Sequence, residues 1–482
     1  MDVTLARERL ELGLYELNSQ AKAWDRRQNY LEGEQDLPYA PEGVNEEYAA
    51  LQEMSTANWL DIAAGAPVQR LQVDGFKTGR DDTADSTVWN EVWQPNRLDS
   101  RQGIVFLQMY VHGRGMMSVS ANPRKRKTPK IRPENARNVW LQPDPEDPFT
   151  HEYAVKVIQV RERADSQLIL PDYLAYSSTK KFGYVYDDNE WMRFVSVGGS
   201  GAWTYDTQGR HGFNMLPYVP FDYKVDANGR PRSAIEGLFP QQDAINTIRF
   251  NTLLAMQFSA FRQRVFTGFD PVVRDKSGNP VLRMDDNGKP VLAKNGQPVP
   301  VLNSPGRVGV DRALVFPGTE TKVFDLPESN LDNYIKVLQE FLTDFFATGQ
   351  IPPQYMLSRM ANLSGDALAG AESTLQSLVK DLKRAAGESL EEVMRLSNRA
   401  RGESHEDNAS EVIWADTEPR SFAQIVDAIG KLIGGGMARK DAWMMLPGAT
   451  PPAVKQWVKN ADDELAAQDA ALNDTVRELE AV

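Results

Sequence analysis

The sequence predicts an α+β protein, and three observations support this fold class. Residues 1–40, 46–64 and 99–112 carry apolar side chains at helical spacing. Residues 138–223 instead form short runs of alternating, β-branched and aromatic side chains between turns. The third observation is a helical stretch from Ser364 to about Arg401, some three times the average globular length and roughly 55 Å long. We therefore expect a domain with a meandering sheet, followed by an elongated helical part.

Turn-forming residues set the expected bounds of the N-terminal elements. Gly33 and Pro38 should stop the first helix, and a single second helix should occupy Glu46 to Ala64. Residues 67–76 alternate as a strand. The segment Asp99 to His112 is apolar enough for a buried helix, and the glycines that follow it should turn the chain into the next strand.

The middle of the chain combines an unusually apolar helix with a small β insertion. Gln241 to Phe266 places apolar groups on nearly every side, which predicts a helix packed against neighbouring copies as well as its own chain. Three Gly-X-Pro-Val turns follow, beginning at Gly278, Gly288 and Gly296. Glycine suits turns with positive φ, and each proline limits its strand to an edge, so this segment should be a β appendage. A helix from Leu331 to Ala347 comes after it.

Composition limits the functional classes. At 482 residues, with 41% hydrophobic and 25% charged residues, the chain is long enough for several folded domains. It has no cysteine, which excludes disulfides, thiolate metal sites and cysteine nucleophiles. The net charge of −13 argues against tight wrapping of nucleic acid, but it is compatible with a protein that surrounds DNA without gripping it. We expect neither a signal peptide nor a membrane-spanning segment.

The enzyme-like motifs lack the context that their chemistry requires. Gly288-Lys289 is followed by a proline inside a turn, so it is no phosphate-binding loop. The segment Gly198 to Ala202 resembles the turn that carries a nucleophilic serine, but a strand rather than a helix should follow it. Asp285 to Gly288 suggests a calcium loop, yet arginine and lysine occupy two of the ligand positions. With four scattered histidines, the sequence predicts no catalytic residue, metal site or cofactor.

The order of these elements, together with a set of short motifs, resembles the portal proteins of tailed bacteriophages, most closely those of siphophages that infect actinobacteria. The motifs extend along nearly the whole chain: Tyr30 to Gly33 with Leu37-Pro38, Val68 with Arg70-Leu71, Val73 to Phe76, Trp93 to Asp99, Gln242 to Asn246, Gly349 to Pro353, Asn362 to Leu368, Trp414 to Asp416, and Ser421 to Gly436. None is catalytic, and their order and spacing carry the resemblance. One departure is Gly365-Asp366, where such portals often have serine or alanine and then glutamate.

The resemblance implies a homo-oligomeric ring, usually of twelve subunits, at one capsid vertex of the virion, assembled in the host cytoplasm. Residues 1–240 would be the wing, 241–269 a stem helix, 270–317 the β-rich clip, 318–347 the return segment and second stem helix, 348–363 the tunnel loop, 364–402 the long spanning helix, and 403–482 the helical crown. The ring would dock the terminase large subunit and later the head–tail adaptor, and double-stranded DNA would pass through it. Major capsid protein and scaffold would be further partners. No enzyme activity, cofactor or membrane would be required.

The tunnel loop is the implied point of contact with DNA. It carries one formal charge, Arg359, among the polar residues Gln354, Tyr355, Ser358 and Asn362. Such groups would touch a sliding polyanion weakly and without sequence preference.

A second candidate contact is the basic run Arg124, Lys125, Arg126 and Lys127, in a loop between two prolines. This run suits a nucleic-acid patch. A solvated loop at a subunit contact is at least as consistent with an acidic protein, so both interpretations stay open.

Two other functions also stay open at the level of sequence. One is a different phage head-morphogenesis protein, such as a capsid-associated scaffold component. The other is a soluble hydrolase with a β-rich binding domain, which would account for the ten tryptophans and many carboxylates. Ring-shaped particles with a central hole would distinguish a portal from both.

Overall fold

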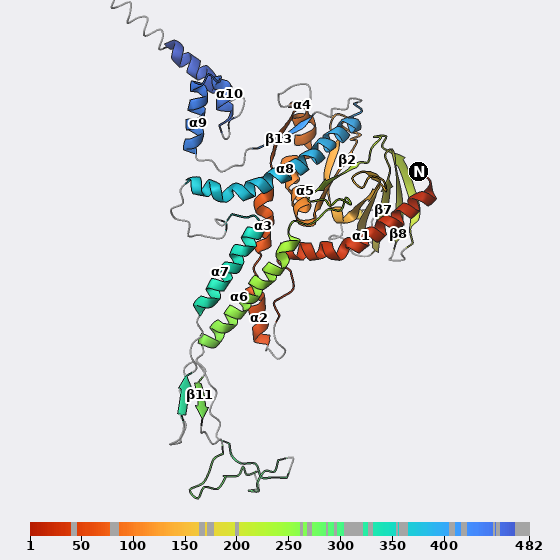
Figure 1. Cartoon of the computed structure of the whole chain (residues 1–482). Helices are drawn as coiled ribbons and strands as arrows, with labels where there is room; N and C mark the ends of the chain where they lie inside the picture. The colour runs from red at the N-terminus through yellow and green to blue at the C-terminus, as the bar shows by residue number, and fades with distance from the viewer. Residues whose placement is uncertain are drawn as a thin grey trace, which may run out of the picture. The chain divides into compact units, whose positions relative to one another are not determined.

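The computed structural model describes residues 1–39, 46–77, 86–162, 169–170, 178–197, 202–260, 264–267, 272–285, 288–293, 296–302, 322–325, 331–352, 355, 365–403, 410–415, 422–446, 449 and 454–467. The protein is α+β, as predicted (Figure 1). The chain divides into two compact units. Met1–Gln35, Asn58–Pro240 and Thr343–Val482 form the first, and Asp36–Ala57 with Gln241–Leu342 form the second. The seven-part division expected from the sequence stays a prediction.

A six-stranded antiparallel sheet from the strand-rich region forms one part of the first unit. Its strands are β4 (Val139–Pro143), β5 (His151–Glu162), β6 (Ile169–Leu170), β7 (Ser178–Tyr186), β8 (Glu190–Val197) and β9 (Thr204–Arg210), in the order β4-β5-β7-β8-β9 with β6 paired to β5. Helix α1 (Val3–Glu32) lies along this sheet, ends at Gly33 as expected, and buries Leu10 in a core cluster with Phe194 (Figure 1). A Cβ on Gly183 would lie 2.6 Å from Leu10 Cδ1, so the missing side chain lets the helix sit directly on the sheet.

A second antiparallel sheet has the order β10-β2-β3. Its strands are β2 (Arg114–Ser120), β3 (Lys130–Glu134) and β10 (Tyr218–Asp222). Helix α5 (Leu98–His112) forms where a buried helix was predicted, and it packs on this sheet together with α8 (Gly365–Arg401). Helix α8 is 37 residues long, which confirms the predicted long helix, and it buries Leu375, Leu382 and Val393.

Two short strands bring distant parts of the first unit together. β1 (Val73–Lys77) pairs antiparallel with β13 (Glu411–Trp414), so that Val73 lies opposite Trp414. Lys383 of α8 lies over the Trp414 ring at 5.8 Å, and its Nζ donates to the Ala415 carbonyl at 3.0 Å. The long helix thereby holds the strand that follows it.

The single helix expected over Glu46 to Ala64 is wrong. Two helices, α2 (Glu46–Ser55) and α3 (Trp59–Val68), occupy this stretch. Asn58 starts the second one, because its Oδ1 accepts from the Asp61 amide at 3.2 Å and caps α3. The apolar spacing continues through the break, which is why periodicity alone did not reveal it.

The strand expected over residues 67–76 is also wrong in its first half. Helix α3 continues through Pro67 to Val68, and the strand begins only at Val73. Pro67 and Val68 are both buried as part of the last turn of the helix, so they do not belong to an alternating strand.

The helix expected over Gln241 to Phe266 ends earlier. Helix α6 (Phe239–Ala260) is followed by β11 (Arg264–Thr267), which pairs antiparallel with β12 (Lys322–Asp325). β11 contains valine, phenylalanine and threonine, which fit a strand better than a helix end. The helix is not buried on every side within the chain, since Met256 is 49% exposed. Its packing against neighbouring copies stays a prediction.

Polar contacts hold the segment after α2 to α6 within the second unit. Gln242 Nε2 donates to the Ala57 carbonyl at 2.7 Å, and the Ala57 amide donates to Asn246 Oδ1 at 3.1 Å. Arg249 Nε donates to the Ser55 carbonyl at 2.8 Å. The Gln242 to Asn246 motif therefore has a structural role.

The β appendage forms as predicted. Gly278, Gly288 and Gly296 adopt φ of 84°, 74° and 78° at the tips of three consecutive hairpins. Helix α7 (Leu331–Thr348) follows, close to its expected bounds. The remaining helical elements are α4 (Ser86–Val88), the π-helix η1 (Trp89–Trp93), the 3-10 helices η2 (Gln94–Asn96), η3 (Ala136–Asn138) and η5 (Glu236–Leu238), α9 (Phe422–Gly434), α10 (Arg439–Met444), and a helix over 454–467.

Candidate functional site

The two groups of predicted contact residues lie toward opposite ends of α8. Tyr355 precedes the helix and reaches Glu372 through Arg70, whereas the basic turn lies beside Arg401. The helix rises roughly 40 Å between Glu372 and Arg401, at 1.5 Å per residue. The two groups therefore do not form one site. Gln354, Ser358, Arg359 and Asn362 lie outside the described residues.

The loop after α7 starts from a defined helix stop. Gln350 adopts a φ of 58°, its amide donates to the Ala347 carbonyl at 3.1 Å, and the Ile351 amide donates to the Phe346 carbonyl at 2.8 Å. This is the Schellman arrangement, in which a left-handed residue closes the helix. Ile351 and Phe346, the two positions whose apolar side chains usually accompany such a stop, are both buried. The start of the loop is thus defined by two backbone hydrogen bonds.

Tyr355 connects this loop to the body of the first unit. Its hydroxyl accepts a long hydrogen bond of 3.4 Å from Arg70 Nη2, and Arg70 Nη1 donates to Glu372 Oε2 at 3.0 Å. The side chains of Arg70 and Glu372 are only 14% and 7% exposed. Burial lowers the pKa of Arg70, but its hydrogen bonds with Glu372 and Tyr355 outweigh that effect and the net pKa is raised.

Sequence reasoning missed the roles of Arg70 and Glu372. Arg70-Leu71 was visible only as a motif, and the partner of Arg70 lies 302 positions away in the chain. Because Arg70 holds both α8 and Tyr355, it links the position of the loop to the long helix.

The basic run forms the turn between β2 and β3. The side chain of Asn122 holds this turn, since its Oδ1 accepts from the amides of Arg124 and Lys125. Lys127 Nζ lies 4.0 Å from Glu91 Oε1, and Arg401 Nη2 lies 2.8 Å from Glu91 Oε2. The turn is therefore anchored beside the last turn of α8, while the side chains of all four basic residues remain exposed. These contacts are compatible with either interpretation of the run.

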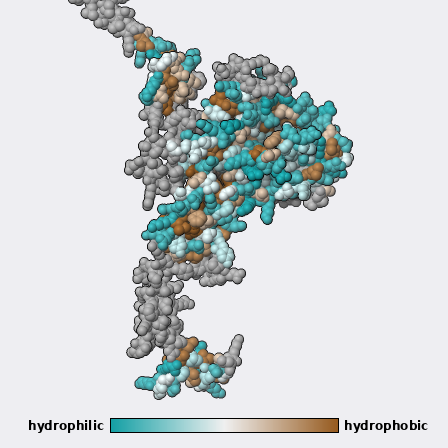
Figure 2. Space-filling model, in the orientation of Figure 1, coloured by the Kyte–Doolittle hydropathy of each residue, from teal (hydrophilic) through white to brown (hydrophobic). Residues whose placement is uncertain are grey.

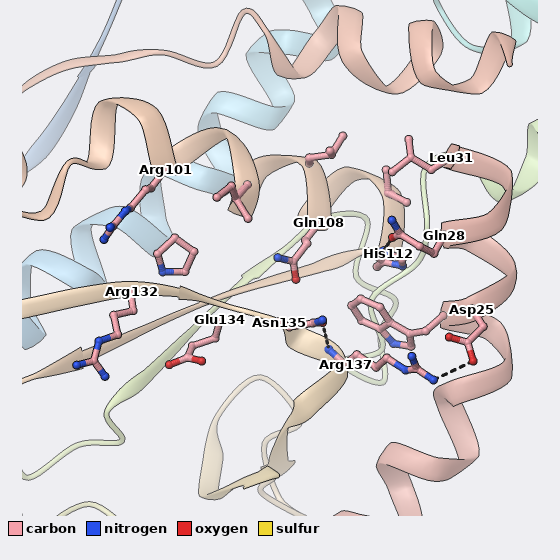
Figure 3. A pocket seen from close by; sticks show the side chains of 15 residues that line it. Asp25, Gln28, Leu31, Arg101, Gln108, His112, Arg132, Glu134, Asn135 and Arg137 are labelled. Atoms are coloured by element: carbon pink, nitrogen blue, oxygen red, sulfur yellow. Dashed lines mark hydrogen bonds and ion pairs between the residues drawn. The ribbon is translucent and has the colours of Figure 1, made fainter. Parts of the chain in front are cut away.

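A cavity of about 750 Å³ lies between α1, α5 and β3, and the sequence did not indicate it (Figure 3). Its lining is part apolar, including Leu31, and part charged, including Arg101 and Arg132. Trp24 stacks on His112 at 3.9 Å between ring centroids. The two rings close one side of the cavity.

The histidine of this cavity is neutral near pH 7, and its two carboxylates are paired. Burial, and to a lesser extent the Arg27 guanidinium, lowers the pKa of His112 to about 3, so the imidazole is neutral near pH 7. Asp25 pairs with Arg137 at 2.8 Å (Figure 3), and Glu134 pairs with Lys156 at 2.8 Å. A glycoside hydrolase uses one carboxyl as acid and another as base or nucleophile, whereas these two carboxylates are each paired with a cation.

The other enzyme-like signals also have structural explanations in the described residues. β8 and β9, on either side of the Gly198 to Ala202 segment, pair antiparallel, which confirms the strand expected after it. Asp285 Oδ1 accepts from the Lys289 amide inside a hairpin turn. Within the described ranges, no group of three or more histidine or carboxylate side chains is placed to hold a metal ion. Among the helices that the structure describes, none is long and apolar enough to cross a membrane.

Comparison with known proteins decides the family. Residues 13–470 match the family model described as phage portal protein, SPP1 Gp6-like. The chain belongs to this portal family. It is 24% identical over 435 residues to the portal protein of Mycobacterium phage D29, covering 85% of this chain and 79% of that protein. It is also 24% identical over 389 residues to the portal protein of Mycobacterium phage L5, covering 76% and 70%.

These comparisons confirm the predicted family and its link to phages of actinobacteria. The chain is a phage portal, and as such a component of the virion. A chain from the neck of an empty GTA particle, computed with C6 symmetry, aligns with a TM-score of 0.41 and 11% identity. That alignment covers 86% of this chain and 97% of the other.

Proposed function

We propose that this portal forms a ring of twelve copies at one capsid vertex, and that DNA is packaged and later ejected through its central channel. One observation carries the proposal: the portal family model matches residues 13–470, a span that includes α6, the β appendage, α7, the loop and α8. The ring has a structural role and catalyses no reaction. It assembles in the host cytoplasm before it enters the virion.

The parts of the chain have distinct roles in this proposal. Residues 1–240 are the wing, with 364–402 as its long spanning helix. The stem consists of residues 241–269 and 318–347, and residues 270–317 are the clip. Residues 403–482 form the crown. The clip docks the terminase large subunit during packaging and the head–tail adaptor afterwards, and capsid protein and scaffold surround the wing.

Imaging of the purified protein in negative stain tests the ring directly. We expect particles with a central hole and about twelve-fold symmetry. Sedimentation of a monomer at every salt and protein concentration would contradict the ring.

The loop between α7 and α8 is the proposed tunnel loop. Its start is held by the Gln350 helix stop, and Tyr355 is held by Arg70, so the loop has a fixed root on the first unit. Polar and singly charged groups allow a polyanion to slide, because they bind phosphates weakly and without reading the bases.

Arg359→Ala tests the contact with DNA. We expect packaged DNA length or retention to fall while ring assembly is unchanged, since one cation near the phosphates is lost. Lys336→Ala, on the exposed surface of α7, is a control that removes one cation outside the loop. If Arg359→Ala instead prevents ring assembly, the residue has a structural role.

A further inference from the structure

The appendage, residues 272–302, is built from turns of one design. In each turn, the glycine amide donates to the carbonyl three residues earlier: Gly278 to Asp275 at 3.0 Å, Gly288 to Asp285 at 3.0 Å, and Gly296 to Ala293 at 2.9 Å. Asp275 Oδ1 also accepts from the Asn279 amide at 2.9 Å, and Asp285 Oδ1 from the Lys289 amide at 2.8 Å. Two of the three aspartates in the segment are thus used by the backbone of the turns.

The strands of the appendage close on one another. Val281 donates to Val273, Val301 donates to Val281, and Val273 donates to Val301, all between backbone groups and at 2.7 to 2.9 Å. Arg283, Val291 and Val299 form a second closed set, at 2.8 to 2.9 Å. Every strand therefore has a partner on both sides at these positions. This leaves no open edge there for a strand of another protein.

The prolines occupy the alternate positions. Pro280, Pro290, Pro298 and Pro300 are bridge partners of Arg274, Met284, Leu292 and Leu282. A proline has no N–H, so these four positions have no donor to offer to an added strand. The Gly-X-Pro-Val repeat thus places valine where the backbone N–H and C=O bond to neighbouring strands of the appendage. It places proline at the alternate positions, where the backbone does not make these bonds.

The apolar side chains of the appendage stay in contact with water. Met284 is 56% exposed and Leu292 and Leu302 are each 61% exposed, and none of the described residues in this segment is buried. Figure 2 shows hydrophobic patches between hydrophilic ones on the visible face of the appendage. A segment of this size seldom forms a sufficient core by itself, so these side chains leave water only when another chain covers them.

Charge separates the appendage from the rest of the chain. Between residues 272 and 302 there are five basic and three acidic residues, a net charge of +2 in a chain of −13. Arg283 and Lys289 are exposed in the same segment as these apolar side chains. A complementary surface would combine an apolar cleft with carboxylates at its rim.

From these observations we infer that the appendage docks into an acidic-rimmed apolar cleft on a partner protein other than this chain. Met284, Leu292 and Leu302 enter the cleft, and Arg283 and Lys289 pair with its rim. Strand addition at the paired valine and arginine positions plays no part, because each strand already has a partner on both sides there. This inference rests on the proposed docking role of the clip and specifies the chemistry of the partner's surface.

The test uses full-length rings and two purified probes, the terminase large subunit and the head–tail adaptor encoded with this chain. Wild-type rings should bind at least one of them. Met284→Ser/Leu292→Ser/Leu302→Ser should bind that protein at least tenfold more weakly, while rings in negative stain are unchanged. Arg283→Glu/Lys289→Glu should also weaken binding and remove its salt dependence. Leu12→Ser/Tyr15→Ser, which changes exposed side chains of α1, is the matched control and should bind normally.

The possible failures are distinguishable. If wild-type rings bind neither protein, the docking role of the clip is wrong, and this inference falls with it. If the wild type binds and the triple serine variant binds equally well, only the inference is wrong. Loss of rings in the serine variant would mean that a second copy covers the surface. Binding of a 30-base-pair duplex that is lost only in the charge-reversal variant would assign the surface to DNA instead.

Discussion

Removing the Glu372 carboxylate should destabilise the first unit and loosen the root of the tunnel loop. In Glu372→Gln, Arg70 keeps its charge with its side chain only 14% exposed, but it loses the carboxylate at 3.0 Å. Breaking a buried ion pair by removing one partner costs about 3–5 kcal/mol. Arg70 keeps some access to water, and the glutamine amide still accepts a hydrogen bond, so we expect a loss of about 2–3 kcal/mol in the free energy of unfolding.

Urea unfolding followed by tryptophan fluorescence, at one fixed protein concentration, measures this loss. The matched control is Asp381→Asn on the same helix. It breaks the Arg384–Asp381 pair, whose side chains are 77% and 63% exposed, and should cost less than about 0.5 kcal/mol. Hydrogen exchange at Ile351 and Tyr355 should speed up in Glu372→Gln and stay unchanged in the control.

A double variant tests whether the unpaired charge of Arg70 causes the loss of stability in Glu372→Gln. Arg70→Met/Glu372→Gln removes both charges, so it should cost less than the sum of the two single changes by about 1 kcal/mol or more. A Glu372→Gln loss as small as that of the control would refute the reasoning. So would a double variant whose cost equals the sum.

Two further predictions concern the helix stop and the buried histidine. Gln350→Gly should raise the free energy of unfolding by about 0.5–1 kcal/mol, because relief of left-handed strain of about 1–2 kcal/mol exceeds the added chain entropy. The control Gln339→Gly, within α7, should instead lower the free energy of unfolding by about 1 kcal/mol. A lower free energy of unfolding in both variants would contradict the explanation. His112 has a pKa lowered to about 3, so the unfolded chain binds its proton first, and stability should be lost progressively as pH falls from about 6.5 toward 3. His112→Phe keeps the stack on Trp24 and should flatten this acid loss in thermal melts between pH 6 and pH 4, whereas an unchanged slope would show that other groups cause it.

Much of the fold could be predicted because its signals are local. The bounds of α8 and α1 follow from apolar periodicity and from Gly33, and the appendage follows from three repeated turns in which glycine takes positive φ. The order of these elements, together with the order and spacing of the short motifs, also predicted the portal family. Two of the failures have different causes. Asn58 splits the second helix through a local cap on α3, whereas the end of α6 gives way to β11 because that strand pairs with residues 322–325.

The candidate site was less predictable than the fold. Tyr355 was expected in the loop, but no sequence pattern pointed to Arg70 as its partner or to Glu372 as the group that fixes Arg70. The cavity closed by Trp24 and His112 was missed for the same reason, since its walls come from α1, α5 and β3. Such sites depend on side chains far apart in the chain.

The sequence by itself determined the α+β class, the long helix, the turn repeat and the family, since each depends on short-range spacing or on the order of motifs. Only the tertiary structure decided that the basic turn and Tyr355 lie toward opposite ends of α8, that Arg70 joins the loop to that helix, and that the strands of the appendage pair with one another on both sides at six positions. The physical reason is that ion pairs, ring stacks and hydrogen bonds between strands depend on distances in space, and residues as far apart as Arg70 and Glu372 come within 3.0 Å only when the chain is folded.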